Sequence, residues 1–400
     1  MFKNLGTILV LCFAAVLLTG TACAAITQTA DEQINLGTNT LFYSVVPADG
    51  GYFIAAVIDD KLAVLKTDAN FKVQSQTEIK GTKTAGLVTT DDGGCVVLAV
   101  SGTKDATLYR MDAKCGIVWE TPIYDTSFGI KGVAVSGSVV KTAGWLAGTD
   151  TGIIQGYSFA NGNPANDEMK LENKPVMAIQ GDGDTWVMVG GTHSTPRTKG
   201  SSAWIMKMQE GGKIVFETTI RDNCDEENAS MYQGGYGAAA YNFCKTSDGG
   251  YYVVGTQTPF SSDNLEMYGQ IWGAKINKSG KVTWQKDLKG AIPYGVAEID
   301  GQYVIAGYAL STAYCYFVTA DGLVYRENYE DESVGCYYSV ESDNKGNVIL
   351  GGCINRGDGK GACGYVTIFN DSGKQAASPV PVFGIAAGLL GAAALFLRRK

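Results

Sequence analysis

One pattern of polar and apolar positions recurs along almost the whole sequence. A turn of acidic residues and glycines, as at Asp248–Gly250, precedes a short apolar run, here Tyr251–Val254. Further along, a second polar turn, Asn277–Gly280, precedes a segment that carries an aromatic residue, Trp284. Short apolar runs bounded by glycine-rich turns are typical of β-strands, so the pattern predicts strands and tight turns.

Seven copies of the first turn divide the chain into units of similar length. Counted from residues 50, 93, 137, 183, 249, 301 and 345, the successive spacings are 43, 44, 46, 66, 52 and 44 residues. Each unit has an alternating segment before the first turn, the apolar run after it, and two more segments on either side of the second turn. This predicts four strands for each unit. A unit of this size cannot bury both faces alone, so we expect the units to stack radially as propeller blades.

The two ends of the repeat array complement each other. The seventh unit supplies three strands before the chain enters a proline-containing segment, whereas Ile26–Asp31 is an unpaired β-like segment that resembles the fourth strand Val73–Thr77. We therefore predict an all-β fold, a seven-bladed β-propeller of four-stranded blades, in which the N-terminal strand completes the last blade and closes the ring. The fourth-strand aromatic residue is expected to pack between neighbouring blades. A stacked β-solenoid is the alternative, although it would favour shorter repeats.

The N-terminal segment has the features of a signal peptide. Lys3 precedes the apolar run Ile8–Leu18, and small residues follow. We predict a signal peptide over residues 1–24, with cleavage between Ala24 and Ala25. Cys23 raises the alternative of lipid attachment, but the preceding residues lack the aliphatic residue that a lipobox requires.

The C-terminal segment predicts a membrane anchor. After the propeller body at 25–374 and a linker at 375–379, residues 380–397 contain no charge, and as a helix they would rise about 27 Å, close to one hydrocarbon core. A basic tail, Arg398–Lys400, follows and would stay in the cytoplasm. The motif Pro381, Phe383 and Gly384, the apolar helix over 380–400 and its basic tail resemble the PGF-CTERM-like sorting tails of archaeal surface proteins. Pro-Val-Phe-Gly stands where Pro-Gly-Phe would be expected. The resemblance implies a body on the outer face of the membrane.

The repeat itself also resembles a known family. Its turn, apolar run and fourth-strand tryptophan are similar to the secreted propeller repeats of archaea and bacteria, with a consensus near D-G-G-Y-V-V-A-G followed by L-D-x-x-G-x-x-x-W. The resemblance covers residues 26–374 and implies the fold rather than an activity. The same turn and tryptophan resemble the docking motif of quinoprotein propellers. Those enzymes need a cofactor pocket with a metal and stacking groups, which this sequence does not let us assemble.

Composition and charge narrow the function classes. The net charge is −8, and without the four basic residues near the termini 28 basic residues face 40 acidic ones, a net charge of −12. Such an acidic body repels phosphate backbones, so we expect no nucleic-acid partner. The chain has a single histidine and no nucleophile elbow, zinc motif or phosphate loop. We therefore expect a non-enzymatic protein without catalytic residues; a secreted enzyme that acts on glycans, or a quinoprotein-like dehydrogenase, is the alternative.

Eight cysteines remain after the predicted signal peptide, and an even count in an exported chain favours disulfides. The absence of a C-x-x-C motif disfavours the alternative of a metal site. Strand order favours the pairs Cys95–Cys115 and Cys353–Cys363. Proximity and elimination add Cys315–Cys336 and Cys224–Cys244. The pair Cys336–Cys353 competes with these. Bridges between molecules are a further alternative.

The 66-residue spacing marks an insertion between the fourth and fifth units, from Arg221 to Gly237. Loops on one face of a propeller commonly bind partners, so the candidate partner-binding face is this insertion with the neighbouring loops His193–Ser202 and Gln257–Gly269. Its members are His193, Arg197, Asp222, Asp225, Glu226, Glu227, Tyr232 and Tyr236. The acidic cluster suggests Ca²⁺ binding, but we favour a solvated, glycosylated loop and predict no cofactor. The candidate glycosylation sites are the sequons at Asn228, Asn277 and Asn370.

These features together predict a membrane-anchored surface protein on the extracellular face of the cell envelope. It would bind an extracellular protein or glycan, mediate adhesion, or assemble with itself into a surface layer or sheath. A central channel lined by two or more buried carboxylates, or by a metal cluster, would favour the enzyme. A smooth channel rich in glycine and tyrosine would favour the binding or coat role.

Overall fold

The computed structural model describes residues 26–101, 105–123, 128–146, 148–193, 201–221, 236–259, 270–288, 292–309, 312–329, 335–343, 345–355 and 361–371. Residues 28–369 form one compact body, and the two terminal segments, 1–27 and 370–400, form a second unit. Within the described ranges, 28 β-strands form seven four-stranded sheets, and no helix is long and apolar enough to cross a membrane. The predicted signal peptide, linker and anchor lie outside the described residues.

Each sheet is one blade, and the strands follow the chain. Blade 1 contains β2 (Thr40–Ala48), β3 (Gly51–Ile58), β4 (Lys61–Asp68) and β5 (Val73–Glu78), and blade 2 contains β6 (Lys83–Thr89), β7 (Cys95–Ser101), β8 (Asp105–Met111) and β9 (Ile117–Ile123). Blade 3 contains β10 (Phe128–Ser136), β11 (Val139–Leu146), β12 (Gly152–Ser158) and β13 (Met169–Leu171), and blade 4 contains β14 (Val176–Asp182), β15 (Thr185–Gly191), β16 (Ala203–Gln209) and β17 (Ile214–Arg221).

The remaining three blades continue in the same way. Blade 5 contains β18 (Tyr236–Lys245), β19 (Tyr251–Pro259), β20 (Gln270–Ile276) and β21 (Val282–Leu288), and blade 6 contains β22 (Ile292–Ile299), β23 (Gln302–Ala309), β24 (Thr312–Val318) and β25 (Val324–Tyr329). Blade 7 contains β26 (Gly335–Ser342), β27 (Asn347–Asn355), β28 (Ala362–Asp371) and, as its fourth strand, β1 (Ile26–Ile34).

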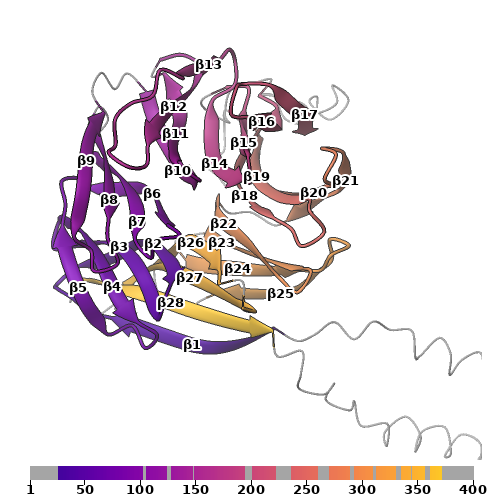
Figure 1. The fold of residues 1–400 in the computed structure, drawn as a ribbon. Coiled ribbons are helices and arrows are strands. Elements are labelled where there is room, and N and C mark those ends of the chain that lie inside the picture. Colours follow the sequence, from indigo (N-terminus) through magenta and orange to yellow (C-terminus); the bar gives the residue numbers. More distant parts are fainter. Residues whose placement is uncertain are drawn as a thin grey trace, which may run out of the picture. The chain divides into compact units, whose positions relative to one another are not determined.

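The blades close into a seven-membered ring (Figure 1). The first strand of each blade contacts the first strands of both neighbouring blades, from β2 round to β26 and back to β2. Blade 7 has the strand order β1-β28-β27-β26, and Thr29 Oγ1 donates a hydrogen bond to Ile368 O at 3.4 Å. The predicted seven-bladed propeller, including closure by the N-terminal strand, is therefore confirmed.

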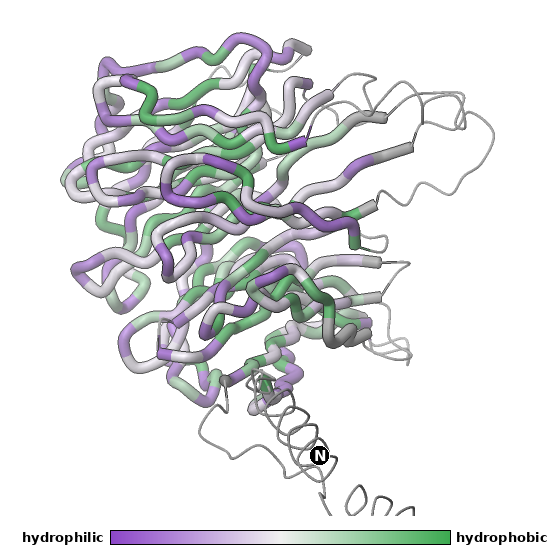
Figure 2. Tube along the Cα trace, turned by 90° about the vertical axis from the view of Figure 1, so that its right-hand side faces the viewer, coloured by the Kyte–Doolittle hydropathy of each residue, from purple (hydrophilic) through white to green (hydrophobic). Residues whose placement is uncertain are grey.

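The core lies between blades rather than within one. The second and third strands are covered on both faces, so β3 is buried almost throughout, whereas the outermost strand β5 alternates between half-buried and exposed residues. This explains why the apolar runs after the turns do not alternate. One buried cluster, for example, joins Phe53 and Val64 of blade 1 with Val97 and Met111 of blade 2. Figure 2 shows hydrophobic segments inside the body and hydrophilic residues at the turns.

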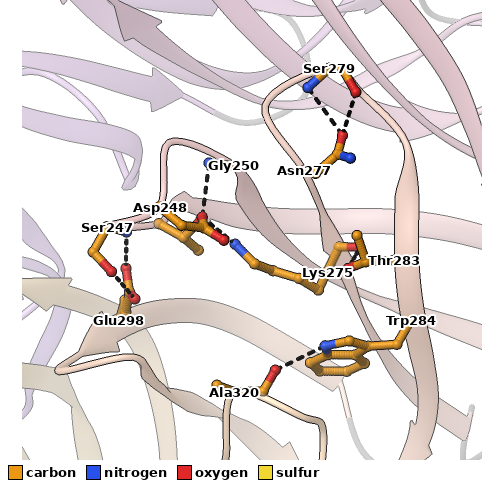
Figure 3. A network of polar contacts seen from close by, with 11 residues as sticks. Ser247, Asp248, Gly250, Lys275, Asn277, Ser279, Thr283, Trp284, Glu298 and Ala320 are labelled. Atoms are coloured by element: carbon orange, nitrogen blue, oxygen red, sulfur yellow. Dashed lines mark hydrogen bonds and ion pairs between the residues drawn. The ribbon is translucent and has the colours of Figure 1, made fainter.

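The fourth-strand aromatic residues pack between blades, as predicted. Trp284 of β21 donates its indole N–H to Ala320 O of blade 6 at 2.9 Å (Figure 3), and Trp119 of β9 donates to Phe159 O of blade 3 at 2.9 Å. The ring in each case lies over a glycine in the turn between the third and fourth strands of the next blade. A Cβ atom at Gly322 would lie 2.9 Å from the Trp284 ring, and φ there is +86°. Glycine is therefore required both by the contact and by the backbone.

The same joint is built differently between blades 1 and 2. There the turn residue is Cys115, with φ of 63°, and the opposing strand carries the small residue Ser75 in place of an aromatic one. Thr77 Oγ1 donates to Cys115 O at 2.7 Å, as Thr218 Oγ1 does to Gly280 O at 2.6 Å between blades 4 and 5. A large turn residue is thus matched by a small partner across the joint.

Candidate functional site

The inner wall of the ring carries the same irregularity in every blade. Each first strand has a β-bulge against its second strand, so that one extra residue leaves the ladder near the middle of the strand. Around the ring from blade 1 to blade 7 the extra residues are Tyr43, Ala85, Lys131, Met177, Tyr241, Tyr294 and Tyr338. Since the first strands surround the central axis (Figure 1), these backbone positions form a ring around that axis, whose surroundings we call the central channel.

Four consecutive blades place a tyrosine at this position. We call Tyr241, Tyr294, Tyr338 and Tyr43, from blades 5, 6, 7 and 1, the tyrosine arc. The centroids of Tyr43 and Tyr338 are 5.1 Å apart with stacked rings, and those of Tyr294 and Tyr338 are 5.7 Å apart. Tyr294 is 37% exposed, and the other three rings are half-buried. Tyr43, Tyr338 and Tyr294 therefore form a contiguous, partly exposed aromatic surface, and Tyr241 holds the equivalent position in blade 5.

Small residues and side-chain hydrogen bonds hold the bulges in place. Ser339, directly after the bulge of blade 7, accepts a hydrogen bond from Val45 N of blade 1 at 3.0 Å. Asn242, at the same position in blade 5, donates from Nδ2 to Tyr294 O of blade 6 at 2.8 Å. In blade 6 the position is Gly295, where a Cβ atom would lie 2.8 Å from Val340 N. The innermost strands approach so closely here that side chains must be small or bonded across the joint.

Three phenols of the arc, those of Tyr43, Tyr294 and Tyr338, are neutral at physiological pH. Burial raises the pKa of Tyr294 to about 12 and also raises the pKa values of Tyr43 and Tyr338 above their ordinary value. Neighbouring thiols and phenols add to the effect, because Cys336 and Cys353 lie beside Tyr338. These three residues can therefore offer ring faces and hydroxyl groups without a charge of their own.

Two hollows adjoin the channel at the end of the first strands where the turns such as 248–250 lie, which we call the turn face. One has a volume of about 680 Å³ and is lined by blades 4, 5, 6 and 7, and the other, of about 840 Å³, is lined by blades 7, 1 and 2. Glu341 and Ser342 border both hollows, and Glu298 borders the first. Two carboxylates from adjacent first strands therefore share one hollow.

The two carboxylates differ in their partners. Glu298 accepts hydrogen bonds from the Ser247 backbone N–H at 2.5 Å and from Ser247 Oγ at 2.7 Å (Figure 3). Among the described residues, no lysine or arginine pairs with Glu341. Residue 341 is exposed, yet protein atoms crowd its carboxylate, and the resulting desolvation raises the pKa of Glu341 to about 7.

Replacing Glu341 by Gln is expected to change how stability depends on pH. The folded-state pKa of about 7 exceeds the ordinary 4.5, so the folded protein binds the proton more tightly, and the stability this contributes is lost as pH rises through that window. Glu341→Gln removes this loss. Because solvent screens the carboxylate, the effect is small. We expect the free energy of unfolding of the variant, relative to that of the wild type, to be only about 1 kcal/mol higher at about pH 8 than at about pH 4.

Chemical denaturation of both proteins at the two pH values measures the difference. The matched control is Glu78→Gln, which removes an exposed carboxylate from the outer strand β5, where it pairs with Lys61 at 3.1 Å. If Glu341→Gln changed the free energy of unfolding equally at both pH values, the raised pKa of Glu341 would be contradicted.

Other carboxylates of the turn face are neutralised by the protein itself. Asp182 accepts from Lys207 Nζ at 2.5 Å, from Tyr251 OH at 2.6 Å and from Lys245 Nζ, which joins blades 4 and 5. Burial alone would raise the pKa of Asp182, but these three donors outweigh it and hold the pKa well below its usual value. Asp248 pairs in the same way with Lys275 Nζ at 2.6 Å (Figure 3). These turns are scaffold, held by their own lysines.

The predicted partner-binding face lies mostly outside the described residues. Of its members, only His193 has a described side chain, and its Nδ1 lies 2.7 Å from Asp150 Oδ2 of blade 3. Tyr236 begins β18, so its backbone is placed. Those outside the description are Arg197, Asp222, Asp225, Glu226, Glu227 and Tyr232. The prediction that this face binds a partner or Ca²⁺ stays a prediction.

The three predicted glycosylation sites differ in their position in the structure. Asn277 lies in the turn between β20 and β21 and is half-buried, and its Oδ1 accepts from Ser279 N at 3.0 Å and Lys281 N at 2.9 Å. Asn370 lies near the end of β28, and Asn228 lies outside the described residues. The cleavage position at Ala24 and Ala25 and the motif at Pro381, Phe383 and Gly384 also lie outside them.

Seven of the eight cysteines are described, and six of them are free thiols in this structure, namely Cys95, Cys115, Cys244, Cys336, Cys353 and Cys363. Cys95 and Cys115 pack in one buried cluster, as the predicted pair requires. Cys336 lies directly opposite Cys353 in the ladder between β26 and β27, which is the competitor pairing. Cys363 and Cys353 also lie near each other, whereas Cys224 is outside the description. The disulfides stay predictions, and blade 7 brings together three thiols that could pair in two ways.

In the described part of the chain, no group of three or more His, Cys, Asp and Glu side chains is placed to hold a metal ion.

The sequence analysis did not identify the tyrosine arc. The signal that could have found it is a tyrosine followed by Ser, Asn or Gly seven or eight residues before the turn glycine, as at Tyr294 and Gly301.

Comparison with known proteins supports the fold alone. No protein-family model and no curated protein matches this sequence. Among solved structures, a Dos1 propeller is similar with a TM-score of 0.50 and 10% identity, over 83% of this chain and 78% of that one. The AfRom2 CNH domain is similar with a TM-score of 0.51 and 11% identity, over 87% of this chain and 99% of that one. At sequence identities this low, the similarity supports a shared propeller architecture but no shared activity.

Proposed function

We propose that this chain is a non-enzymatic binding protein of the cell envelope, exported by its N-terminal segment and anchored at its C-terminus, whose propeller body binds a ligand in the central channel. The observation that carries the proposal is the tyrosine arc on four consecutive blades. The apolar, charge-free segment 380–397 and its basic tail support the anchor.

The arc has the properties of a preorganised binding surface. Tyrosine offers a large, amphipathic contact area at a low cost in conformational entropy. The bulges fix the four backbones, and Ser339 and Asn242 tie neighbouring bulges together at 3.0 Å and 2.8 Å. A ligand therefore meets a surface that needs little ordering, which favours affinity.

One observation favours a second candidate, an enzyme that acts on glycans. Glu298 and Glu341 share a hollow, and burial raises the pKa of Glu341 to about 7, as a general acid requires. A screen of glycan substrates with the wild type and Glu341→Gln separates the candidates. Hydrolysis by the wild type that Glu341→Gln abolishes would replace the binding role by this one.

The test of the proposed function is made on intact cells that express the native chain. Protease treatment of intact cells should remove the body from the outside, and mass spectrometry of the purified protein should place the N-terminus near residue 25. Protection from protease until the cells are lysed would refute the surface location.

The same material tests the assembly version of the role. Envelope protein is compared by electrophoresis with and without thiol reductant. Polymers released only by the reductant would indicate cross-linking between molecules, as expected of a coat. A monomer in both lanes would exclude a disulfide-linked coat and leave the ligand-binding role.

A further inference from the structure

We propose that the tyrosine arc and Glu341 together bind an alkylammonium group carried on an extended amine, either a free polyamine or a lysine side chain of a peptide, inside the central channel. The inference rests on the proposed binding role and specifies its ligand class.

The first argument is the placement of the two parts on one strand. Tyr338 is the bulge residue of β26, and Glu341 follows three residues later, towards the turn face. Three residues of strand span roughly 10 Å. An extended amine with two nitrogens could therefore rest one against the ring faces while the other reaches the carboxylate.

The second argument is charge. The faces of phenol rings attract cations, most strongly where water is partly excluded. Tyr294 and Tyr338 are neutral, and their centroids are 5.7 Å apart, so one cation can contact both rings. The body is acidic, which raises the local concentration of cations at the channel.

The third argument is that Glu341 lacks the partner that comparable carboxylates have. Asp182 and Asp248 are each neutralised by lysine from the protein, at 2.5 Å and 2.6 Å. No described lysine or arginine does this for Glu341. A carboxylate that is crowded by protein and has no basic partner attracts an incoming cation, which would offset its partial desolvation.

The charged groups around Glu341 leave its charge uncompensated. In the hollow towards blades 5 and 6 they are Lys245, Glu298 and Asp300, and in the hollow towards blades 1 and 2 they are Asp49, Asp91, Asp343 and Lys345. Lys245 is already bound to Asp182. Acidic groups therefore outnumber the remaining basic one, which favours a cationic ligand over an anionic one.

The experiment is isothermal titration calorimetry of the purified full-length chain with three probes. Spermidine is the free polyamine, an acetylated oligolysine peptide presents the same group on a peptide, and 1,8-octanediol is the uncharged chain of similar length. We expect spermidine or the peptide to bind, the diol not to bind, and affinity to rise with pH as Glu341 ionises. The arm that binds more tightly identifies the source of the amine.

Two variants assign the site, each with a matched control. Glu341→Gln is expected to weaken binding about tenfold, whereas Glu78→Gln, on the outer strand of blade 1, leaves it unchanged. Tyr294→Leu is expected to weaken it by a similar factor, of about ten, whereas Tyr294→Phe keeps the ring and stays within about twofold. Circular dichroism confirms that each variant is folded.

Three results would overturn the inference: no binding of either amine, equal binding of the diol, or undiminished affinity in Glu341→Gln and Tyr294→Leu. Titration with neutral oligosaccharides separates this failure from failure of the binding role. A sugar that binds to the wild type and not to Tyr294→Leu would keep the arc as the site and replace the amine as its ligand. An intracellular location of the chain would refute the surface role without affecting the titrations.

Discussion

Deletion of residues 26–34 is expected to abolish the stable propeller in an otherwise full-length chain. These residues are β1, the fourth strand of blade 7, and without them β28 becomes an open edge. The deletion removes the buried side chain of Ile26 and the strand that holds the two ends of the ring together. We expect a loss of about 5 kcal/mol or more, comparable to the whole stability of many domains, together with self-association through the open edge.

Thermal unfolding by circular dichroism and size-exclusion chromatography measure the effect. A synthetic peptide of residues 26–34 should restore the melting temperature by adding the missing strand in trans, and a scrambled peptide should not. A deleted chain that melts as the intact chain does, as a monomer, would show that the ring does not depend on β1.

Replacement of Gly295 by Val is expected to cost about 3 kcal/mol and to weaken any ligand that binds the tyrosine arc. A Cβ atom at this position would lie 2.8 Å from Val340 N and 2.9 Å from Val340 Cβ on the next blade. Both are parts of a first strand fixed in its ladder, so the blades must separate to admit the side chain. Tyr294 precedes this residue, and its ring would move with the strand.

The control is Gly211→Val, because Gly211 is exposed and a Cβ atom there would meet nothing within 4 Å. Chemical denaturation of both variants compares the costs. If the two variants were equally stable, the close approach of the first strands would not be a constraint on the sequence.

The fold was predictable because its signals are local and repeated. Asp248–Gly250 and its counterparts mark the same hairpin turn in each unit, and the apolar run after it marks a strand covered on both sides. Closure by the segment Ile26–Asp31, which the structure extends to Ile34, followed from counting strands. The packing of Trp284 between blades followed from its position, since an aromatic residue on the outermost strand has only the next blade to pack against.

The candidate site was not predictable in the same way. A bulge is a property of the pairing between two strands, and the register that skips Tyr338 between Tyr337 and Ser339 cannot be seen in one strand alone. The unpaired state of Glu341 likewise depends on neighbours from other blades. Sequence reasoning instead favoured the insertion Arg221–Gly237, because loops are where function is usually found.

The matched joints between blades have a consequence for how such a chain can change during evolution. Trp119 requires Gly162 opposite it, where a Cβ atom would lie 2.6 Å from the ring, whereas Cys115 is accommodated opposite Ser75. Each blade is therefore fitted to its successor, and exchanging two blades would set a bulky side chain against a turn that cannot receive it. Duplication or shuffling of single blades must be followed by paired substitutions at the new joint. The repeats are alike in fold, but their order in the ring is specified.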